Sequence, residues 1–148
     1  MKEGFEHVFS DIQADMVSIC LEYVEGKADK IFIYGSYESN AMTCNYFYIV
    51  DGELYKKSKL PAGYDVSIDR QKACMKILFD DMDRLISTCA EYEADMPTEI
   101  KLVYDVKNNK LKADYQYDEI FSNTDENAND IFEKWYQEML EELWVKKK

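Results

Sequence analysis

Two neighbouring runs of sequence decide the fold: Ile31-Phe32-Ile33-Tyr34-Gly35-Ser36-Tyr37 and Thr43-Cys44-Asn45-Tyr46-Phe47-Tyr48-Ile49-Val50. Both runs consist largely of β-branched and aromatic residues, which predicts two strands. Asp51-Gly52 follows as a two-residue hairpin signal, and the strand pattern resumes in Glu53-Leu54-Tyr55-Lys56. We therefore expect three antiparallel strands, the first two joined by a polar turn near Glu38-Ser39-Asn40.

Helical periodicity flanks these strands on both sides. Residues 4–25, 67–94 and 127–145 carry apolar side chains at the i, i+3, i+4 and i+7 spacing of an amphipathic helix. Ser67 is a suitable N-cap for the second helix, and Met96-Pro97 ends that helix. The sequence thus predicts three helices, each with one apolar face.

Two further alternating runs, residues 100–106 and 111–117, predict a second hairpin with one buried face across an Asn108-Asn109 turn. The element order is then αβββαββα. Strands do not alternate with helices, so a doubly wound parallel sheet is not expected. The predicted class is α+β: an antiparallel sheet of about five strands with helices packed on one face, in a single domain spanning residues 1–148.

The charge balance restricts the classes of partner. The chain has 30 acidic and 18 basic side chains, a formal net charge of -12. This excess disfavours nucleic acid and anionic membranes as partners, because both are polyanions, and it favours basic proteins. No window approaches the roughly 18 apolar residues that span a bilayer, and the start at Met1 lacks the apolar stretch of a signal peptide. A cytoplasmic location is therefore expected.

The acidic excess gathers in two segments of the second half. Residues 80–99 hold seven acids against Arg84, and residues 114–142 hold ten against Lys134. Solvated surface is the ordinary explanation of such runs, and a negative patch that docks a basic protein is the functional one. Alternate tyrosines near the second segment add contact area at low entropic cost. The predicted partner-binding surface comprises Asp80, Asp83, Asp114, Tyr115, Tyr117, Asp118, Asp125 and Asp130.

Two acidic motifs resemble metal sites but are not predicted to bind a metal. On a helix, Asp80 and Asp83 are neighbours, whereas the intervening Asp81 points elsewhere. The segment 125–130 begins like a calcium loop, but Asp130 stands where glycine is required and Tyr136 where a bidentate glutamate belongs. Capping of the last helix by Asp125 or Asn127 explains this segment better. No metal and no cofactor are therefore predicted.

Signatures of catalysis are sparse. The four cysteines, Cys20, Cys44, Cys74 and Cys89, form no CxxC pair and are expected to be reduced and buried. His7 is the single histidine, and nothing in the sequence sets it beside a nucleophile. No phosphate loop, dinucleotide fingerprint or nucleophile elbow occurs. No catalytic residue is predicted.

The run Leu60-Pro61-x-x-Tyr64-Asp65-Val66-Ser67 leads into the long helix, and the second hairpin ends in Lys112-Ala113-Asp114-Tyr115-Gln116-Tyr117-Asp118. In both features the chain resembles the YezG-like family of bacterial antitoxin or immunity proteins, over roughly residues 5–120. The tail departs, since only Trp135-Tyr136 matches the Trp/Tyr-rich segment of the family. The resemblance implies a small acidic cytosolic protein without catalytic residues that binds and neutralises a cognate secreted toxin, often a nuclease.

The working hypothesis is an immunity protein whose partner is a cognate polymorphic toxin with a basic nuclease domain. Two alternatives stay open. A small carboxylate-based or metal-dependent enzyme would have two acids facing each other in a pocket with raised pKa values. An adaptor would use the same acidic surface to bind another basic protein. A tyrosine-rich edge strand can also pair two copies into a homodimer, or pair with the toxin by strand addition.

Overall fold

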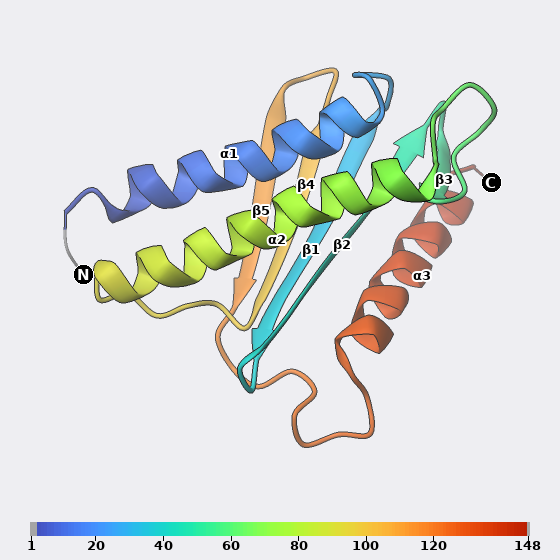
Figure 1. Ribbon diagram of the computed structural model, residues 1–148. Coiled ribbons are helices and arrows are strands. Elements are labelled where there is room, and N and C mark those ends of the chain that lie inside the picture. The colour runs from blue at the N-terminus through green and yellow to red at the C-terminus, as the bar shows by residue number, and fades with distance from the viewer. Residues whose placement is uncertain (1–2, 148) are drawn as a thin grey trace.

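The computed structural model describes residues 3–147 (Figure 1). Three residues lie outside the described part of the chain: Met1, Lys2 and Lys148. Met1 belongs to the start that is predicted to lack a signal peptide, and Lys148 is the last residue of the predicted domain. The elements follow in the order α1 (Phe5–Tyr23), β1 (Lys30–Glu38), β2 (Ala41–Val50), β3 (Glu53–Lys56), α2 (Ile68–Glu91), β4 (Glu99–Asp105), β5 (Lys110–Gln116) and α3 (Ala128–Lys147). The predicted α+β class and its element order are confirmed.

The five strands form one antiparallel sheet in the order β3-β2-β1-β4-β5. β1 lies at its centre, where Ile33 stands opposite Tyr46 of β2 and Leu102 of β4. The turn between β1 and β2 uses Ser39 and Asn40, both with positive φ. This is the backbone geometry that matches the twist of a tight hairpin. The three predicted connections, β1–β2, β2–β3 and β4–β5, are all hairpins, and β3 and β5 are the edges of the sheet.

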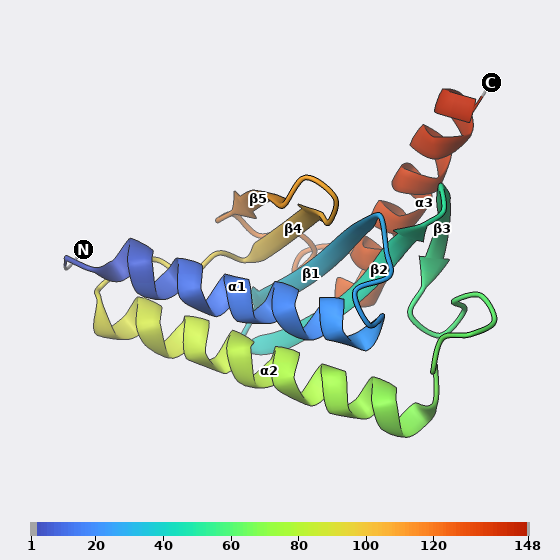
Figure 2. The same cartoon turned by 90° about the horizontal axis from the view of Figure 1, so that it is seen from above.

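Helices cover both faces of the sheet. Figure 2 shows α1 and α2 side by side on one face and α3 on the other. The prediction that the helices share one face is wrong for α3. The cause lies in the central strands, which are apolar on both faces: Ile33 points toward α1 and α2, whereas Phe32 stacks on Phe47 at 4.6 Å on the α3 side. A strand that is apolar on both faces must be covered on both.

The α1–α2 pair forms the larger half of the core. The predicted cap of α2 is confirmed, because Ser67 Oγ accepts a hydrogen bond from the main-chain N–H of Arg70. The guanidinium of Arg70 donates to the carbonyl oxygens of Glu22 and Tyr23. A cation at the last carbonyls of a helix is favourable, since these groups carry the negative end of the helix dipole. One side chain thus links the start of α2 to the end of α1.

The long connection from β5 to α3 is held by a buried carboxylate. Glu38, at the end of β1, is only 4% exposed. Its oxygens accept hydrogen bonds from the main-chain N–H groups of Ile120 (2.6 Å), Phe121 (3.1 Å) and Ser122 (2.7 Å), and from the Ser122 hydroxyl. This anchor fixes the segment that leads into α3 and so helps to position that helix.

Candidate partner-binding surfaces

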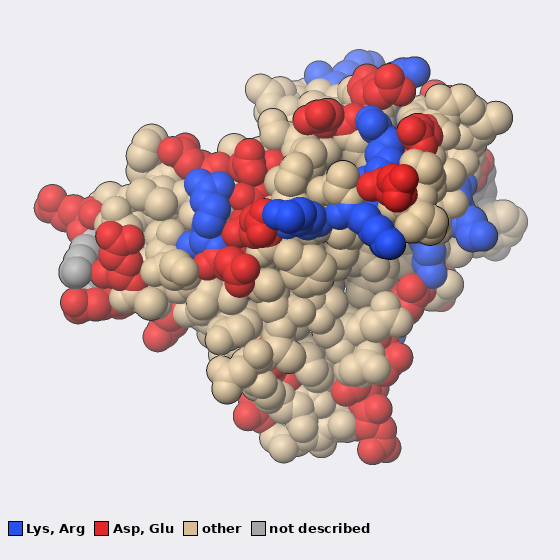
Figure 3. Space-filling model, viewed as in Figure 1, with Lys and Arg blue, Asp and Glu red and all other residues tan. Residues whose placement is uncertain are grey.

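The predicted acidic surface does not form one patch. Asp80 and Asp83 lie on α2, whereas Asp114 lines the opposite face of the sheet beside α3. Basic side chains also interrupt the acids of α2, since Lys76 Nζ lies 3.1 Å from Asp80 Oδ2 and Arg84 is the next residue after Asp83. Figure 3 shows this mixture of signs on the α1–α2 side of the molecule. The structure therefore separates the two acidic segments that the sequence grouped.

Of the two tyrosines at the end of β5, one packs against α1 and the other is exposed. Tyr115 is partly buried, with its ring 5.9 Å from that of Phe9 and its hydroxyl hydrogen-bonded to Gln13. Tyr117 is 56% exposed, and Asp118 follows it on the surface. Of the predicted tyrosines, Tyr117 thus offers more contact area to a partner.

The start of α3 explains the acidic motif that imitates a calcium loop. Asn127 Oδ1 accepts from the main-chain N–H of Asp130, and Asp130 Oδ2 accepts from that of Asn127, each at 2.9 Å. This is a reciprocal capping arrangement, so the predicted cap at Asn127 is confirmed. Asp125 is exposed in the preceding loop. The carboxylate of Asp130 is therefore already engaged within the protein.

The outer side of α3 combines acidic and apolar side chains in one place. We call it the α3 surface and define it by Glu126, Asp130, Glu133, Glu138, Leu140, Glu141, Trp144 and Val145. Its acids line a shallow hollow of about 450 Å³ together with Lys134. Glu141 also borders a second hollow with Leu140 and Trp144, so the charged and apolar parts are contiguous. Of the residues on this surface, only Asp130 belongs to the set predicted from the sequence.

Part of the charge on the α3 surface is neutralised by neighbours. Glu133 Oε2 pairs with Lys56 Nζ at 2.6 Å, and Glu126 pairs with Lys134. Within the described part of the chain, Glu138 and Glu141 form no ion pair and are exposed. These two carboxylates are therefore the ones available to a basic partner.

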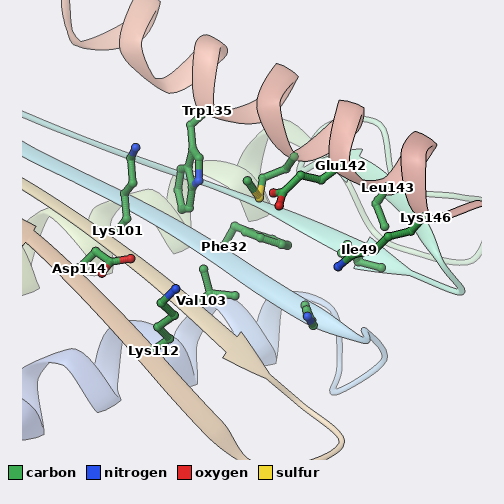
Figure 4. A pocket seen from close by; sticks show the side chains of 12 residues that line it. Phe32, Ile49, Lys101, Val103, Lys112, Asp114, Trp135, Glu142, Leu143 and Lys146 are labelled. Atoms are coloured by element: carbon green, nitrogen blue, oxygen red, sulfur yellow. The ribbon is translucent and has the colours of Figure 1, made fainter.

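A groove between α3 and the part of the sheet formed by β1, β4 and β5 is lined mainly by basic rather than acidic side chains. Figure 4 shows Lys101, Lys112 and Lys146 around an apolar floor that includes Phe32 and Trp135. The cavity holds about 300 Å³, and Lys30, Asp114 and Glu142 also line it. Four lysines outnumber two acids here, although the whole chain is strongly acidic. Ammonium groups above an apolar floor can receive a small anion with an apolar body.

One carboxyl group, that of Asp81 beside Asp15, has the raised pKa that the enzyme alternative requires. Burial, followed by the neighbouring Asp15 carboxylate, raises the pKa of Asp81 to about 7, and Arg84 opposes this rise. Arg84 Nη1 donates to Asp81 Oδ1 at 2.9 Å. Neither Asp15 nor Asp81 lines the two hollows or the groove described above, and Asp81 is buried on α2. The pair therefore belongs to helix packing rather than to a pocket.

The cysteines and the histidine occupy structural positions. All four cysteines are free and buried, as predicted. Burial raises the pKa of the Cys44 thiol to about 12, which keeps it a poor nucleophile. His7 lies on the exposed side of α1 beside Asp11, with 3.4 Å between Nε2 and Oδ2. Cys44 and His7 therefore lack the surroundings of a catalytic pair.

Residues 3–147 contain neither a group of three or more potential metal ligands nor a helix suited by length and hydropathy to crossing a bilayer. No family model matches the chain, and no curated protein is significantly similar to it.

Proposed function

We propose that this protein is an immunity protein that binds and neutralises a cognate secreted bacterial toxin in the cytoplasm. A basic nuclease domain is the partner that best fits a net charge of -12. Opposite net charges accelerate encounter, and a few buried anchors then determine how long the complex lasts. The resemblance to YezG-like proteins supports the same assignment.

The observation that carries the proposal is the exposure of apolar side chains on α3. Trp144 is 64% exposed, Val145 67% and Leu140 40%. Tryptophan is enriched among the residues that dominate binding energy at protein interfaces. Glu138 and Glu141 lie on the same helix within two turns of Trp144. A hydrophobic anchor beside free carboxylates suits a partner that presents an apolar pocket rimmed by lysine or arginine.

The test is calorimetric titration with the toxin domain encoded beside this gene, together with an assay of toxin activity. We expect Trp144→Ala to weaken binding by about tenfold or more, because truncation of an interface anchor costs on the order of 2 kcal/mol. The combined variant Glu138→Lys/Glu141→Lys is expected to slow association and to reduce its dependence on salt.

The matched control is Asp80→Lys/Asp83→Lys, which makes the same change of charge on α2. This variant is expected to bind with affinity closer to that of the wild type. If both reversals and Trp144→Ala bind as the wild type does, the α3 surface is not the interface. If the adjacent gene encodes no toxin and the chain protects no cell from one, the immunity function itself is wrong and an adaptor role gains support.

A further inference from the structure

The edge strand β5 and the residues that flank it change from basic to acidic along the chain. Lys110 and Lys112 precede the midpoint of β5 and Asp114 follows it, while Lys107 lies in the preceding turn and Asp118 and Glu119 in the following loop. The midpoint itself is Ala113. An antiparallel pair of identical strands sets the first half of each strand against the second half of the other. The charge order of β5 is therefore complementary to itself in antiparallel pairing.

The main chain of β5 has free hydrogen-bonding groups at this edge. Two main-chain hydrogen bonds flank β4: the Tyr37 N–H donates to the Thr98 carbonyl oxygen, and the Val106 N–H donates to that of Asp29. They show which alternate residues of β4 direct their main-chain groups toward β1. The remaining residues of β4 face β5, where their partners are Lys110, Lys112, Asp114 and Gln116. By the same alternation, Leu111, Ala113 and Tyr115 direct their N–H and C=O groups away from the sheet. Five residues centred on Ala113 can thus accept another strand.

We propose that two copies of this chain associate by antiparallel pairing of β5 with β5, centred on Ala113, to form one continuous sheet across the dimer. In this register Lys112 of one copy faces Asp114 of the other, and symmetry provides that pair twice. Leu111, which is 43% exposed, faces Tyr115 on the other side of the sheet. The pairing opposes complementary side chains on both faces.

Charge selects this register over its neighbours. Centring the pair on Lys112 would set that lysine against itself, and centring it on Asp114 would do the same to the carboxylate. Like charges directly opposite each other destabilise a strand pair. Neither Lys112 nor Asp114 has an ion-pair partner among residues 3–147, so neither must leave one to form the dimer. Two-fold symmetry makes such an interface closed, which limits growth beyond two copies.

The experiment is sedimentation velocity of the purified chain over a range of concentrations in about 150 mM salt, where net repulsion is partly screened. The wild type is expected to show a reversible monomer–dimer equilibrium. Lys112→Asp and Asp114→Lys should each weaken self-association by about tenfold or more, because each variant opposes like charges twice. Lys72→Asp, an exposed substitution of the same charge on α2, should have a much smaller effect.

Two complementation arms make the test specific to the register. The double variant Lys112→Asp/Asp114→Lys restores both pairs within a homodimer, and an equimolar mixture of the two single variants restores them in a heterodimer. Both should dimerise again. A chain that stays monomeric up to about 1 mM overturns the proposal and leaves the edge to a strand from another protein. Dimerisation that ignores all these substitutions also overturns it. The readout needs no toxin, so it succeeds or fails independently of the proposed function.

Discussion

Replacing Glu38 with glutamine should lower the free energy of unfolding by about 3 kcal/mol and loosen the segment between β5 and α3. The carboxylate accepts three main-chain hydrogen bonds and one from the Ser122 hydroxyl in a nearly inaccessible position. A glutamine retains only one accepting oxygen and turns an NH₂ group toward main-chain donors. At least one buried N–H group therefore loses its partner, which is costly.

The pH dependence identifies the carboxylate as the cause. Burial alone would raise the pKa of Glu38, but the hydrogen bonds from Ser122, Ile120 and Phe121 outweigh burial and lower it. A group whose pKa is lower in the folded state contributes stability above its unfolded pKa and loses it as the pH falls through the folded value. The stability difference between the wild type and Glu38→Gln should therefore be largest near neutral pH and shrink in acid.

Denaturant unfolding at a series of pH values measures this difference, and hydrogen exchange at Ile120, Phe121 and Ser122 reports the local loosening. The control is Glu119→Gln in the same connection, where the side chain is exposed and accepts from Asn123. That variant is expected to change stability by less than about 0.5 kcal/mol. Equal effects of the two substitutions would show that Glu38 is not an anchor.

The fold was predictable because its signals are local. The β-branched and aromatic composition of β1 and β2, the glycine in Asp51-Gly52 and the cap at Ser67 are each signals within a few residues, and the strands, the turn and the cap are present as predicted. The layer occupied by α3 was not predictable in the same way. It depends on whether the second face of β1 is buried, and an apolar Phe32 or Tyr34 can equally be an exposed aromatic on a one-sided sheet.

The candidate surface was harder to predict because sequence proximity does not establish a shared face. Asp114 and Tyr115 are adjacent in sequence, but successive strand residues point to opposite faces of the sheet. Asp80 and Asp114 are separated by the sheet itself. The α3 surface could not be predicted from the sequence, because the spacing of Trp144 on the helix is also compatible with a core position, whereas in the structure its side chain is exposed. Helix periodicity indicates which residues share a face, but it does not indicate how far along the helix that face is packed.

A second large effect is expected at the carboxylate pair of α1 and α2. Asp81 is 2% exposed, and its Oδ2 has no hydrogen-bond partner among the described residues. Two ionised carboxylates can only accept, whereas a protonated Asp81 can donate to Asp15. Burial and the charge of Asp15 accordingly raise the pKa of Asp81 to about 7. The protein therefore holds a proton here that the unfolded chain releases at a much lower pH.

The sign of the resulting pH dependence is opposite to that at Glu38. A carboxyl with a raised pKa in the folded state contributes its stability fully below its unfolded pKa near 4 and loses it as the pH rises through about 7.

Asp81→Asn keeps a neutral side chain at every pH, with an oxygen for Arg84 and an NH₂ for Asp15. We expect this variant to exceed the wild type by about 4 kcal/mol near pH 8 and to match it near pH 3, below the unfolded pKa. Asp83→Asn, two residues along the same helix and exposed, should show no such gain in stability at high pH. Denaturant unfolding of all three proteins across this pH range decides the matter. Parallel stability curves for the wild type and Asp81→Asn would mean that Asp81 is ionised throughout, with Arg84 rather than Asp15 controlling its charge.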